Sequence, residues 1–579
     1  MCGICGYIGG NPKQNVIEKL SLLEYRGYDS CGVGFFSGNK IKIIKSTKKI
    51  DDLSQKIKNE DIKNLVIGHT RWATHGEPSE INAHPHISPD GRWAVVHNGI
   101  IENHDYLKKR YLNGTNFYSQ TDSEVIPCLL SKNDNNILSF ITVCNMLKGS
   151  FAICAINNLE PDRIYVAKNQ SPIYVGIKSG EALCASDTYC FKDYPYYYSL
   201  EDGEFALLKK DKVTFFDKTG KIILKNPQNV KKENDFLYGK KVKYFMEKEI
   251  NEIPFAIKNL REYYLKNGVN ISFCKDDIDR IMLVGCGSAY HSALIGEFYL
   301  KSRLGIEVTT HIASEFRYSD HIISPKTLCI FVSQSGETAD TIASLKMVKG
   351  KCHTLAIVNN EHSTLSLNCD NSMYMLCGRE VAVCTTKAFV NGTLALYILA
   401  NYLTGDLCKI KRLSLLEKNI KDFLLTDNVT EQIAEKLKDK KDCFFIGRNI
   451  DYPLQMEAGL KLKEICYINC LSIPSGELKH GSLALIENNT ICFASVTQKR
   501  LLEKNLGNIS EVKARGGDVY LVTTNKTDYE NKIEFKHINS ELDVIELSVF
   551  YQLIAYRVCI KKGLSPDKPR NLAKSVTVE

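Results

Sequence analysis

Cys2 is the residue of this chain best suited to nucleophilic chemistry. It follows Met1, and because a small second residue usually permits removal of the initiator methionine, we expect Cys2 to carry a free α-amine. An α-amine titrates at about pH 8 and a thiol at about pH 8.5, so the amine can act as the base for its own side chain. The thiolate would then be the nucleophile. A cysteine can also stand at this position by chance, so the motifs around it must decide.

A second candidate group lies on one predicted helix near the end of the chain. Glu457, Lys461 and Glu464 are spaced four and three residues apart, which places them on one helical face. Converging charged side chains are what an acid–base site needs. The alternative is a solvated ion pair, the usual meaning of Glu and Lys four residues apart.

A third candidate is the hydroxyl-rich segment VSQSGETADT. It places Ser333, Ser335 and Thr338 between a predicted strand and a predicted helix. Hydroxyls and backbone N–H groups at a helix N-terminus favour phosphate binding, and the carboxyl edge of a parallel sheet is where such folds bind ligands. A capping box would explain one of these hydroxyls but not the whole cluster.

Two kinds of element must position these residues. Up to about residue 235 the chain shows short β-like runs with few helical patterns, which predicts sheets with some helical cover. From about residue 280, continuous apolar strands alternate with helices, and this alternation starts again near residue 440. Such alternation indicates doubly wound parallel sheets, so we predict an α/β multidomain protein with a repeated second part. The second copy has Val496, Thr497 and Gln498 where the first has its Ser/Gly cluster.

The predicted organisation has four parts. The polar, highly charged stretch KNPQNVKKENDFLYGKKVK has few apolar residues, which predicts a linker. The predicted boundaries are 2–235 for the first domain, 236–248 for the linker, 249–405 for the first α/β copy, and 406–579 for the second copy with a C-terminal catalytic tail.

Composition narrows the function classes. The chain has 579 residues and a net charge of +8 with both signs interspersed, which favours a soluble multidomain protein without a nucleic-acid partner. We see no membrane-spanning run or signal peptide, and 21 irregularly spaced cysteines fit a reducing cytoplasm. His69, His84, His86 and His97 lie in different segments, so we expect no metal site.

Five motifs occur in order in the first block: CGICGYIG, LEYRGYDSCGVG, GHTRWATHGEP, HNGIIEN and TDSEV. Together they resemble the glutamine amidotransferase domain of the N-terminal-nucleophile hydrolase class, which implies an αββα sandwich. The resemblance implies that Cys2 attacks the glutamine side-chain amide, while Asn98 and the backbone N–H of Gly99 form the oxyanion hole. Arg71 would bind the α-carboxylate of glutamine and Asp122 its α-ammonium. The other residues that it assigns to this site are Arg26, Thr74, His75 and Gly76.

The hydroxyl-rich segment resembles a loop of the sugar isomerase (SIS) phosphosugar-binding domain. CGSAYHS resembles that domain's first loop, usually C-G-T-S-Y, where Ser288 keeps a hydroxyl and Ala289 loses one. EVAVCTTKAF resembles a third sugar-contacting loop. The residues assigned to sugar-phosphate binding by this resemblance are Ser288, Ser333, Gln334, Ser335, Thr338, Val383 and Thr385.

Three later motifs, MEAGLKLKEICYIN, SGELKHGSLALI and PRNLAKSVTVE, resemble the isomerase half of the glutamine–fructose-6-phosphate aminotransferase family. The resemblance implies a cofactor-free reaction of glutamine and fructose 6-phosphate that gives glucosamine 6-phosphate and glutamate, the first step of the hexosamine pathway. Lys574 would form a Schiff base at C2, and Glu464 would move a proton between C1 and C2. His480 would open the sugar ring from a neighbouring subunit, which implies a homo-oligomer of at least two chains. Lys461 and Glu457 would complete the site.

Trp72, in the R-W-A-T-H-G loop, would gate an internal passage for ammonia in this family. Two alternative enzymes with the same kind of N-terminal domain are a phosphoribosyltransferase and an asparagine synthetase. The first would need an acidic pyrophosphate-binding loop and the second an S-G-G-x-D-S loop, and neither is found in the sequence. A non-catalytic sugar-phosphate sensor would not need Lys574, Glu464 and His480 together. A glutaminase with an inactive synthase half stays open.

Overall fold

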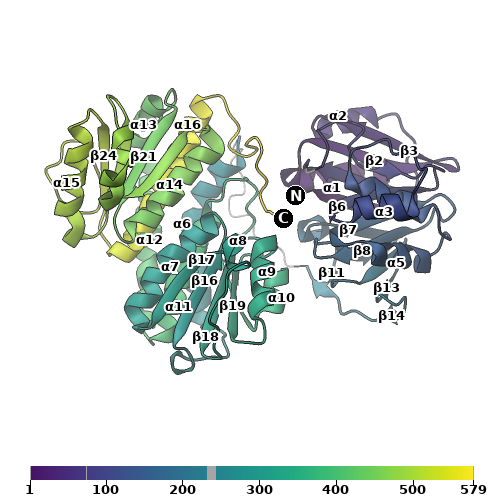
Figure 1. Ribbon diagram of the computed structural model, residues 1–579, viewed down its shortest axis with the longest axis horizontal. Coiled ribbons are helices and arrows are strands. Elements are labelled where there is room, and N and C mark those ends of the chain that lie inside the picture. Colours follow the sequence, from purple (N-terminus) through teal and green to yellow (C-terminus); the bar gives the residue numbers. More distant parts are fainter. Residues whose placement is uncertain (1, 74, 231–242, 578–579) are drawn as a thin grey trace. The chain divides into compact units, whose positions relative to one another are not determined.

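The computed structural model describes residues 2–73, 75–230 and 243–577 and divides into two compact units (Figure 1). The first unit comprises Met1–Lys232 with Ser575–Glu579, and the second comprises Glu233–Lys574. Thr74, predicted to line the glutamine pocket, and residues 236–242 of the predicted linker lie outside the described residues.

Two antiparallel sheets form the centre of the first unit. One has the strand order β15-β11-β9-β10-β1-β4-β2-β3, and the other has β14-β13-β12-β8-β7-β6-β5. Their strands are β1 (Gly3–Ile8), β2 (Ser30–Ser37), β3 (Lys40–Ser46), β4 (Leu65–Arg71), β5 (His86–Ile87), β6 (Trp93–Ile101), β7 (Gly149–Asn157), β8 (Ile164–Asn169), β9 (Tyr174–Lys178), β10 (Glu181–Ala185), β11 (Tyr196–Ser199), β12 (Phe205–Lys209), β13 (Lys212–Phe216), β14 (Ile222–Ile223) and β15 (Gln228–Asn229).

Helices cover the outer faces of this sandwich. Alternate residues of β1 point to opposite sides: Ile4 and Ile8 join the core between the sheets, while Cys5 and Tyr7 pack against α1 and α2. The second sheet packs its outer face against α4 and α5. The predicted αββα sandwich is confirmed. The helices of this unit are α1 (Pro12–Leu23), η1 (Glu24–Arg26), α2 (Ile50–Lys56), α3 (His104–Tyr111), η2 (Asp122–Glu124), α4 (Val125–Leu130), α5 (Ile137–Met146) and η3 (Thr188–Phe191).

Two five-stranded parallel sheets form the second unit, as predicted. Their strand orders are β17-β16-β18-β19-β20 and β22-β21-β23-β24-β25. The strands are β16 (Arg280–Gly285), β17 (Glu307–Ile312), β18 (Thr327–Ser333), β19 (His353–Val358), β20 (Asn371–Tyr374), β21 (Asp442–Gly447), β22 (Asn469–Pro474), β23 (Ile491–Val496), β24 (Asp518–Thr523) and β25 (Lys532–Glu534).

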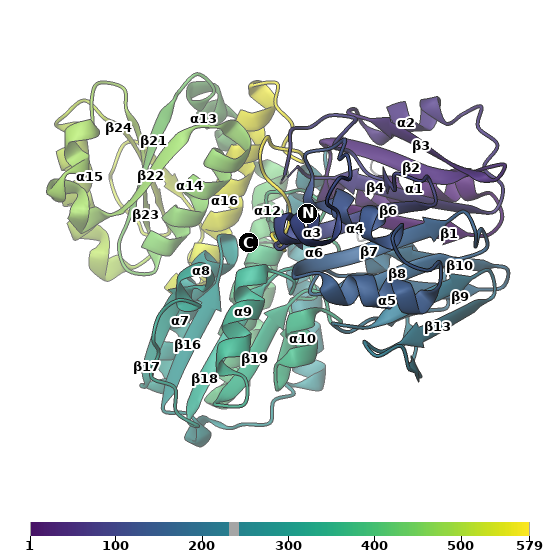
Figure 2. The ribbon, with the colours of Figure 1, turned by 45° about the vertical axis from the view of Figure 1, so that its right-hand side comes forward.

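Both faces of each sheet are covered by helices. In β16, Ile281 and Leu283 join the core under α6, α7 and α11, while Met282 and Val284 pack on the side of α8, α9 and α10 (Figure 2). The helices of this unit are α6 (Phe245–Asn267), η4 (Lys275–Asp277), α7 (Ser288–Leu304), α8 (Ala313–Phe316), α9 (Ala339–Val348), α10 (Thr364–Asn368), α11 (Lys387–Leu403), η5 (Leu407–Arg412), α12 (Leu413–Thr426), α13 (Val429–Leu437), α14 (Asp451–Cys466), η6 (Ser475–His480), η7 (Ser482–Leu485), η8 (Lys499–Leu501), α15 (Leu502–Lys513) and α16 (Ser540–Lys561).

One continuous apolar core joins the two α/β layers. It contains Leu283 and Ile330 from the first sheet and Phe445 and Phe493 from the second. The layers therefore form one compact unit, although the sequence indicates a boundary near residue 405. Helix α6 begins at Phe245, inside the predicted linker, where the Asp567 carboxylate accepts hydrogen bonds from the backbone N–H groups of residues 245 and 246 at 2.8 and 2.9 Å.

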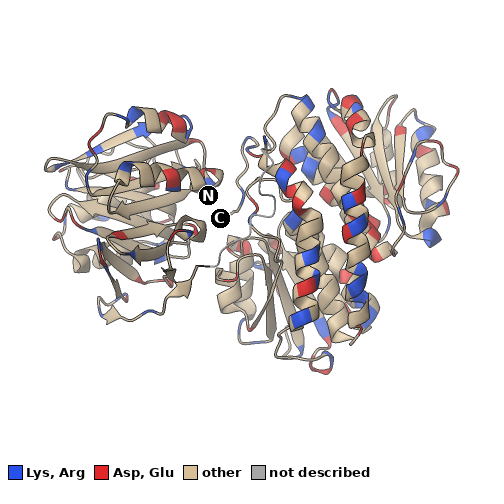
Figure 3. Ribbon diagram, turned by 180° about the vertical axis from the view of Figure 1, so that it is seen from behind, with Lys and Arg blue, Asp and Glu red and all other residues tan. Residues whose placement is uncertain are grey.

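Charge is evenly mixed on the second unit. Figure 3 shows Lys and Arg interspersed with Asp and Glu along its long helices. Among the described residues, no helix has both the length and the apolar character needed to cross a bilayer.

Candidate active sites

The Cys2 thiol lies against the backbone that follows β4. Its Sγ accepts a hydrogen bond from the Trp72 N–H at 3.2 Å. Gly27 makes this approach possible, because a Cβ there would lie 2.7 Å from the Trp72 nitrogen. Asp29 holds the same loop by accepting the Ala73 N–H at 2.8 Å. Burial raises the pKa of the Cys2 thiol, while the Trp72 N–H and the Arg71 guanidinium oppose that rise.

Asn98 and Gly99, on β6, lie beside the nucleophile. The Asn98 side-chain Nδ2 donates to the carbonyl oxygen of Cys2 at 2.8 Å. Gly99 has φ +128°, and a Cβ there would lie 1.9 Å from the Ser150 carbonyl oxygen, so only glycine fits. The structure thus brings together the residues predicted to act as nucleophile and oxyanion hole.

Arg71 and Asp122 are both buried, which a chance surface charge would not be. The Arg71 guanidinium donates to the carbonyl oxygens of Gly76 at 3.1 Å and Glu77 at 3.3 Å, and also to that of His75. Among the described residues no ion pair joins Arg71 to a carboxylate, so its positive charge is available to an anionic ligand. Asp122 accepts the Ile101 N–H at 2.6 Å.

Other predicted residues of this unit shape the surrounding loops. Gly76 has φ +75°, and Trp72 packs edge-to-face on Tyr28 at 5.5 Å between ring centroids. Arg26 forms an ion pair with Asp187 at 2.9 Å.

Four buried histidines lie next to this site, although they come from different segments. His69, His84, His86 and His97 form ring contacts through His84, with centroid distances of 4.2 to 6.4 Å. Burial lowers the pKa of each, so the rings are neutral. Within the described ranges, no group of three or more His, Cys, Asp or Glu is arranged to hold a metal ion.

The charged face of α14 is buried rather than solvated. The Lys461 ammonium lies 2.9 Å from Glu457 and 3.0 Å from Glu464, and the Lys461 side chain is 1% exposed. Burial opposes ionisation of Glu457, but Lys461 and His291 hold the pKa of this carboxyl at about 2. The surface ion-pair alternative is therefore wrong.

Loops of the first α/β layer converge on Lys461. The ammonium donates to the Ser288 hydroxyl at 3.0 Å and to the Thr385 carbonyl oxygen at 3.3 Å, and Ser288 donates to Glu457 at 2.9 Å. Helix α14 of the second layer, the first residue of α7 and the loop before α11 thus build one cluster.

Lys574 lies at the far side of the Thr385 loop. Its ammonium pairs with Glu380, a fully buried carboxylate that also accepts the N–H groups of Thr386 at 2.8 Å and Ala388 at 3.1 Å. Burial opposes its ionisation, but Lys574 and these donors hold the pKa of Glu380 at about 2. The Thr385 hydroxyl also donates to Glu380, so this residue links the surroundings of both lysines.

The hydroxyl-rich loop has a defined geometry after β18. The Ser333 hydroxyl lies 3.1 Å from that of Thr338 and accepts the Gly336 N–H at 3.1 Å, while Ser335 accepts the Glu337 N–H at 3.1 Å. Thr338 occupies the N-cap of α9 without a side-chain capping bond. Gly336 has φ +68°, and a Cβ there would lie 2.0 Å from the Ser363 hydroxyl. Capping therefore does not account for this cluster.

Three predicted residues contribute little to the cluster through their side chains here. Gln334 uses its carbonyl oxygen to accept the Asn359 N–H, and Val383 donates its N–H to the Asp567 carbonyl oxygen. His480 is exposed at the end of η6, and no hydrogen bond or ion pair within the described ranges joins it to the cluster.

Sequence reasoning missed three partners of the site: Glu380, His291 and Cys384. His291 binds Glu457 at 2.8 Å, and the Cys384 thiol donates to Glu464 at 3.1 Å. All three lie inside the segments CGSAYHS and EVAVCTTKAF, but nothing in the sequence indicates which distant carboxylate or ammonium each would meet.

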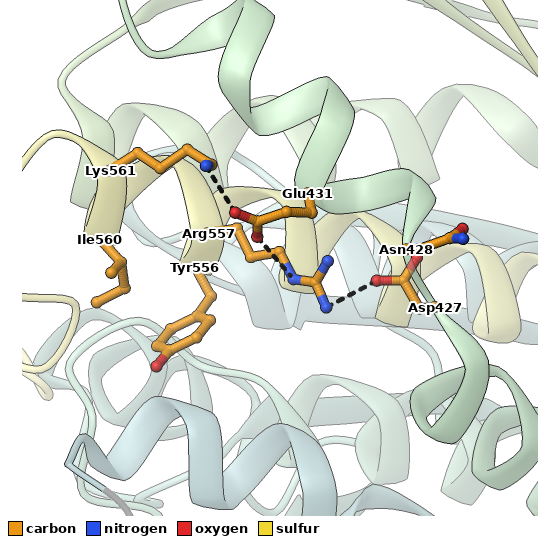
Figure 4. Close-up of a pocket in the computed structure, with 7 residues that line it drawn as sticks. All are labelled: Asp427, Asn428, Glu431, Tyr556, Arg557, Ile560 and Lys561. Carbon is orange, nitrogen blue, oxygen red and sulfur yellow. Dashed lines mark ion pairs between the residues drawn. The ribbon is translucent and has the colours of Figure 1, made fainter.

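A separate hollow lies between α13 and α16 (Figure 4). Its cations are already paired: Arg557 lies 2.9 Å from Asp427, and Lys561 lies 2.6 Å from Glu431. None of the predicted site residues lines it.

Comparison with known proteins agrees with this arrangement. Residues 69–193 match the glutamine amidotransferase domain family, and residues 276–402 and 436–532 match the SIS domain family. The chain is 41% identical to the glutamine–fructose-6-phosphate aminotransferase (isomerizing) of Fusobacterium nucleatum over 611 residues and to that of Caldanaerobacter subterraneus over 610, covering 100% of both chains in each comparison.

Among solved structures, the chain is similar to the C-terminal domain of glucosamine-fructose-6-phosphate aminotransferase from Francisella tularensis. The two are 30% identical with a TM-score of 0.55, over 57% of this chain and 99% of that one. The full-length likeness and both matching domain families lead to one conclusion. The chain belongs to the glutamine–fructose-6-phosphate aminotransferase (isomerizing) family of enzymes.

Proposed function

We infer that this enzyme transfers the amide nitrogen of glutamine to fructose 6-phosphate and isomerises the sugar, giving glucosamine 6-phosphate and glutamate. The full-length likeness to enzymes of that name carries this inference. Two assembled side-chain clusters, one in each unit, support it.

For the amidase half, we propose that the Cys2 thiolate attacks the side-chain amide carbon of glutamine. The developing oxyanion would be met by the Asn98 side chain and the Gly99 N–H, ammonia would leave with the proton from the α-amine, and water would hydrolyse the thioester to glutamate. Arg71 and Asp122 would bind the two charged groups of the amino acid. The buried, carbonyl-bound guanidinium of Arg71 supports its part.

For the synthase half, we propose that Lys574 condenses with the C2 carbonyl of the open-chain sugar and that ammonia then displaces it. Glu464 would take a proton from C1 and return it to C2, which converts the ketose imine into the 2-amino aldose. Ser288, Ser333, Gln334, Ser335, Thr338, Val383 and Thr385 would form the sugar-phosphate site, with Glu457 and Lys461 beneath it. The contacts of Ser288 and Thr385 with Lys461, and of Ser333 with Thr338 after β18, support this assignment.

A coupled assay tests the reaction. Purified enzyme with glutamine and fructose 6-phosphate should release glutamate and glucosamine 6-phosphate in near-equal amounts. Cys2→Ala should abolish both products, whereas Lys574→Met should abolish only the amino sugar. Glutamate without amino sugar from the unmodified enzyme would contradict the proposal and identify a glutaminase with an inactive synthase half.

We also propose that Trp72 gates the transfer of ammonia. Trp72→Ala should leave both half-reactions active but lower the yield of amino sugar per glutamate released. An unchanged ratio would refute this role. Trp72→Phe, which keeps an aromatic ring against Tyr28, is the matched control.

We propose that His480 opens the sugar ring in the site of a neighbouring subunit, so that the enzyme works as at least a dimer. Its exposure, away from Lys574 and Glu464, supports this. Mixing inactive His480→Ala with inactive Lys574→Met under subunit exchange should restore part of the activity. A monomer that is fully active when dilute would overturn the proposal.

The free cysteines of the described chain support a cytoplasmic location, which cell fractionation would test.

A further inference from the structure

The orientation of the Asn98 amide decides whether the oxyanion hole works. A side-chain amide presents an N–H₂ donor on one side and an acceptor oxygen on the other, and a half-turn exchanges them. Only the donor can stabilise an oxyanion. In this structure Nδ2 faces the Cys2 carbonyl at 2.8 Å, while Oδ1 faces the His69 Nε2 at 3.0 Å.

The chemistry of its neighbours fixes which way this amide points. The His69 Nε2 also lies 3.0 Å from the backbone carbonyl oxygen of His97. Because a carbonyl oxygen can only accept, Nε2 must carry the ring proton. The Asn98 atom that faces Nε2 must then be the acceptor Oδ1, which leaves Nδ2 on the side of the nucleophile. On the other side, the Cys2 carbonyl demands a donor as well.

The His69 ring is itself fixed in place, so the hydrogen bond that orients the Asn98 amide is well defined. The residue is 0% exposed, and its ring stacks on His84 with centroids 4.2 Å apart and planes 27° apart. His84 is fixed in turn, because its Nδ1 accepts the His97 N–H at 3.3 Å. Burial lowers the pKa of His69 to about 3, so the ring is neutral and carries one proton.

We propose that His69 is a positioning residue of the glutaminase reaction: its Nε2–H holds the Asn98 amide with the donor toward the oxyanion. The inference rests on the proposed role of Asn98. His69 itself touches neither glutamine nor the reacting atoms. It therefore acts on the transition state through one hydrogen bond, and ground-state binding of glutamine does not depend on it.

The test compares two amides at position 69 whose nitrogens fall at different places. In His69→Gln the side-chain N–H₂ reaches the former position of Nε2, whereas in His69→Asn it reaches that of Nδ1. With glutamate release as the readout, His69→Asn should lower kcat by about 10- to 100-fold, less than the roughly 100- to 1,000-fold loss on removing an oxyanion donor outright, with KM for glutamine changed less than about two-fold. His69→Gln should recover most of kcat.

Two further variants separate this role from a structural one. His86→Asn removes another fully buried histidine of the same cluster, bonded to Tyr118 and Thr121 rather than to Asn98, and should change thermal stability but not kcat. Asn98→Ala should give the largest decrease in kcat, and adding His69→Asn to it should lower kcat little further. The effects of two residues that act through one another are not additive.

The outcomes are distinguishable. If Asn98→Ala leaves kcat unchanged, the proposed oxyanion hole fails, and this inference fails with it. If Asn98→Ala lowers kcat but His69→Asn and His69→Gln are equally active, only the role of His69 is overturned. Full additivity of His69→Asn and Asn98→Ala would overturn it as well.

Discussion

The two α/β layers of the second unit begin in the same way and then differ at one side chain. Gly285 and Gly447 end the first strand of each layer, and a Cβ at either would meet the backbone four residues on, at 2.9 Å from Ala289 or 2.7 Å from Asp451. Gly287 and Asn449 have φ of +53° and +56°, so the turns match residue by residue. Ala289 in the first layer therefore corresponds to Asp451 in the second.

Asp451 lies at the carboxyl ends of the strands of its own layer. Its carboxylate accepts the Thr497 hydroxyl at 2.7 Å and the Thr497 N–H at 3.1 Å, directly after β23. When the two sheets are matched by their registers, Thr497 corresponds to Gln334 of the first layer, and Val496 corresponds to Ser333. In the second layer a carboxylate thus lies at the edge that corresponds to the phosphate site proposed for the first layer.

The two layers contribute different groups to the site of the second unit. The first supplies the hydroxyl-bearing residues Ser288, Ser333 and Thr385, whereas the second supplies the charged helix α14. Substitutions in the two layers should therefore have different consequences.

Lys461→Met should have the largest effect. It would leave Glu457 and Glu464 without their shared cation, and removing one partner of a buried ion pair costs about 3–5 kcal/mol. Amino-sugar formation should fall below about 1% of wild type, because Glu464 would lose the cation that orients it and a loss of about 2.7 kcal/mol of transition-state stabilisation is a hundred-fold change in rate, while glutamate release persists. Lys463→Met, exposed on the same helix, is the matched control. Near-normal synthase activity in Lys461→Met would contradict the helix assignment.

Ala289→Asp should come next, because it would install the carboxylate of the second layer in the first. Repulsion between this carboxylate and the sugar phosphate should raise KM for fructose 6-phosphate by about ten-fold or more, since like charges in a partly buried site cost more than about 1 kcal/mol. Ala289→Asn has the same shape without the charge and should have a smaller effect. Equal KM values for the two variants would show that the layers do not correspond as inferred.

Ser333→Ala should have a moderate effect on substrate binding. A hydrogen bond to a charged group contributes about 1.5–3 kcal/mol, so KM for fructose 6-phosphate should rise about ten-fold, or more if the loop also rearranges. Thr497→Val at the edge of the second layer should leave this KM within about two-fold, because the Thr497 hydroxyl donates to Asp451. A similar rise in both would mean that both layers bind the sugar phosphate.

Asp451→Asn should have the smallest effect, on stability alone. Burial raises the pKa of Asp451 to about 7, although bonds from Thr497 oppose this. Because the folded form holds its proton more tightly than the unfolded form, this group favours folding at low pH, and that contribution is lost as pH rises to about 7. Thermal unfolding of Asp451→Asn should therefore vary less between pH 5 and 8 than that of wild type. An unchanged pH dependence would refute the assignment.

Sequence patterns predicted the elements of the second unit closely. The alternation of apolar strands and helices predicted from about residue 280, and again from about residue 440, is present as β16 to β20 and β21 to β25 with their helices. These succeed because continuous apolar strands and helical periodicity are local properties of the chain. The same locality explains why Glu457, Lys461 and Glu464 could be placed on one face before any fold was known.

Partners that come from distant segments could not be predicted in this way. Nothing near Lys574 in the sequence points to Glu380, 194 residues away, and the four histidines near Cys2 meet only after two sheets pack. Likewise, α6 begins at Phe245, and the N–H of that residue donates to Asp567, 322 residues away.

The kinds of element, their order and the residue types of each site can be predicted from local patterns in the chain, because periodicity and motifs act over a few residues. The buried charges, the side of the Asn98 amide that faces the nucleophile, and the carboxylate at one of two matching turns follow from the packed structure. Desolvation and hydrogen-bond partners, in contrast, are set by whatever segments the packed core brings alongside.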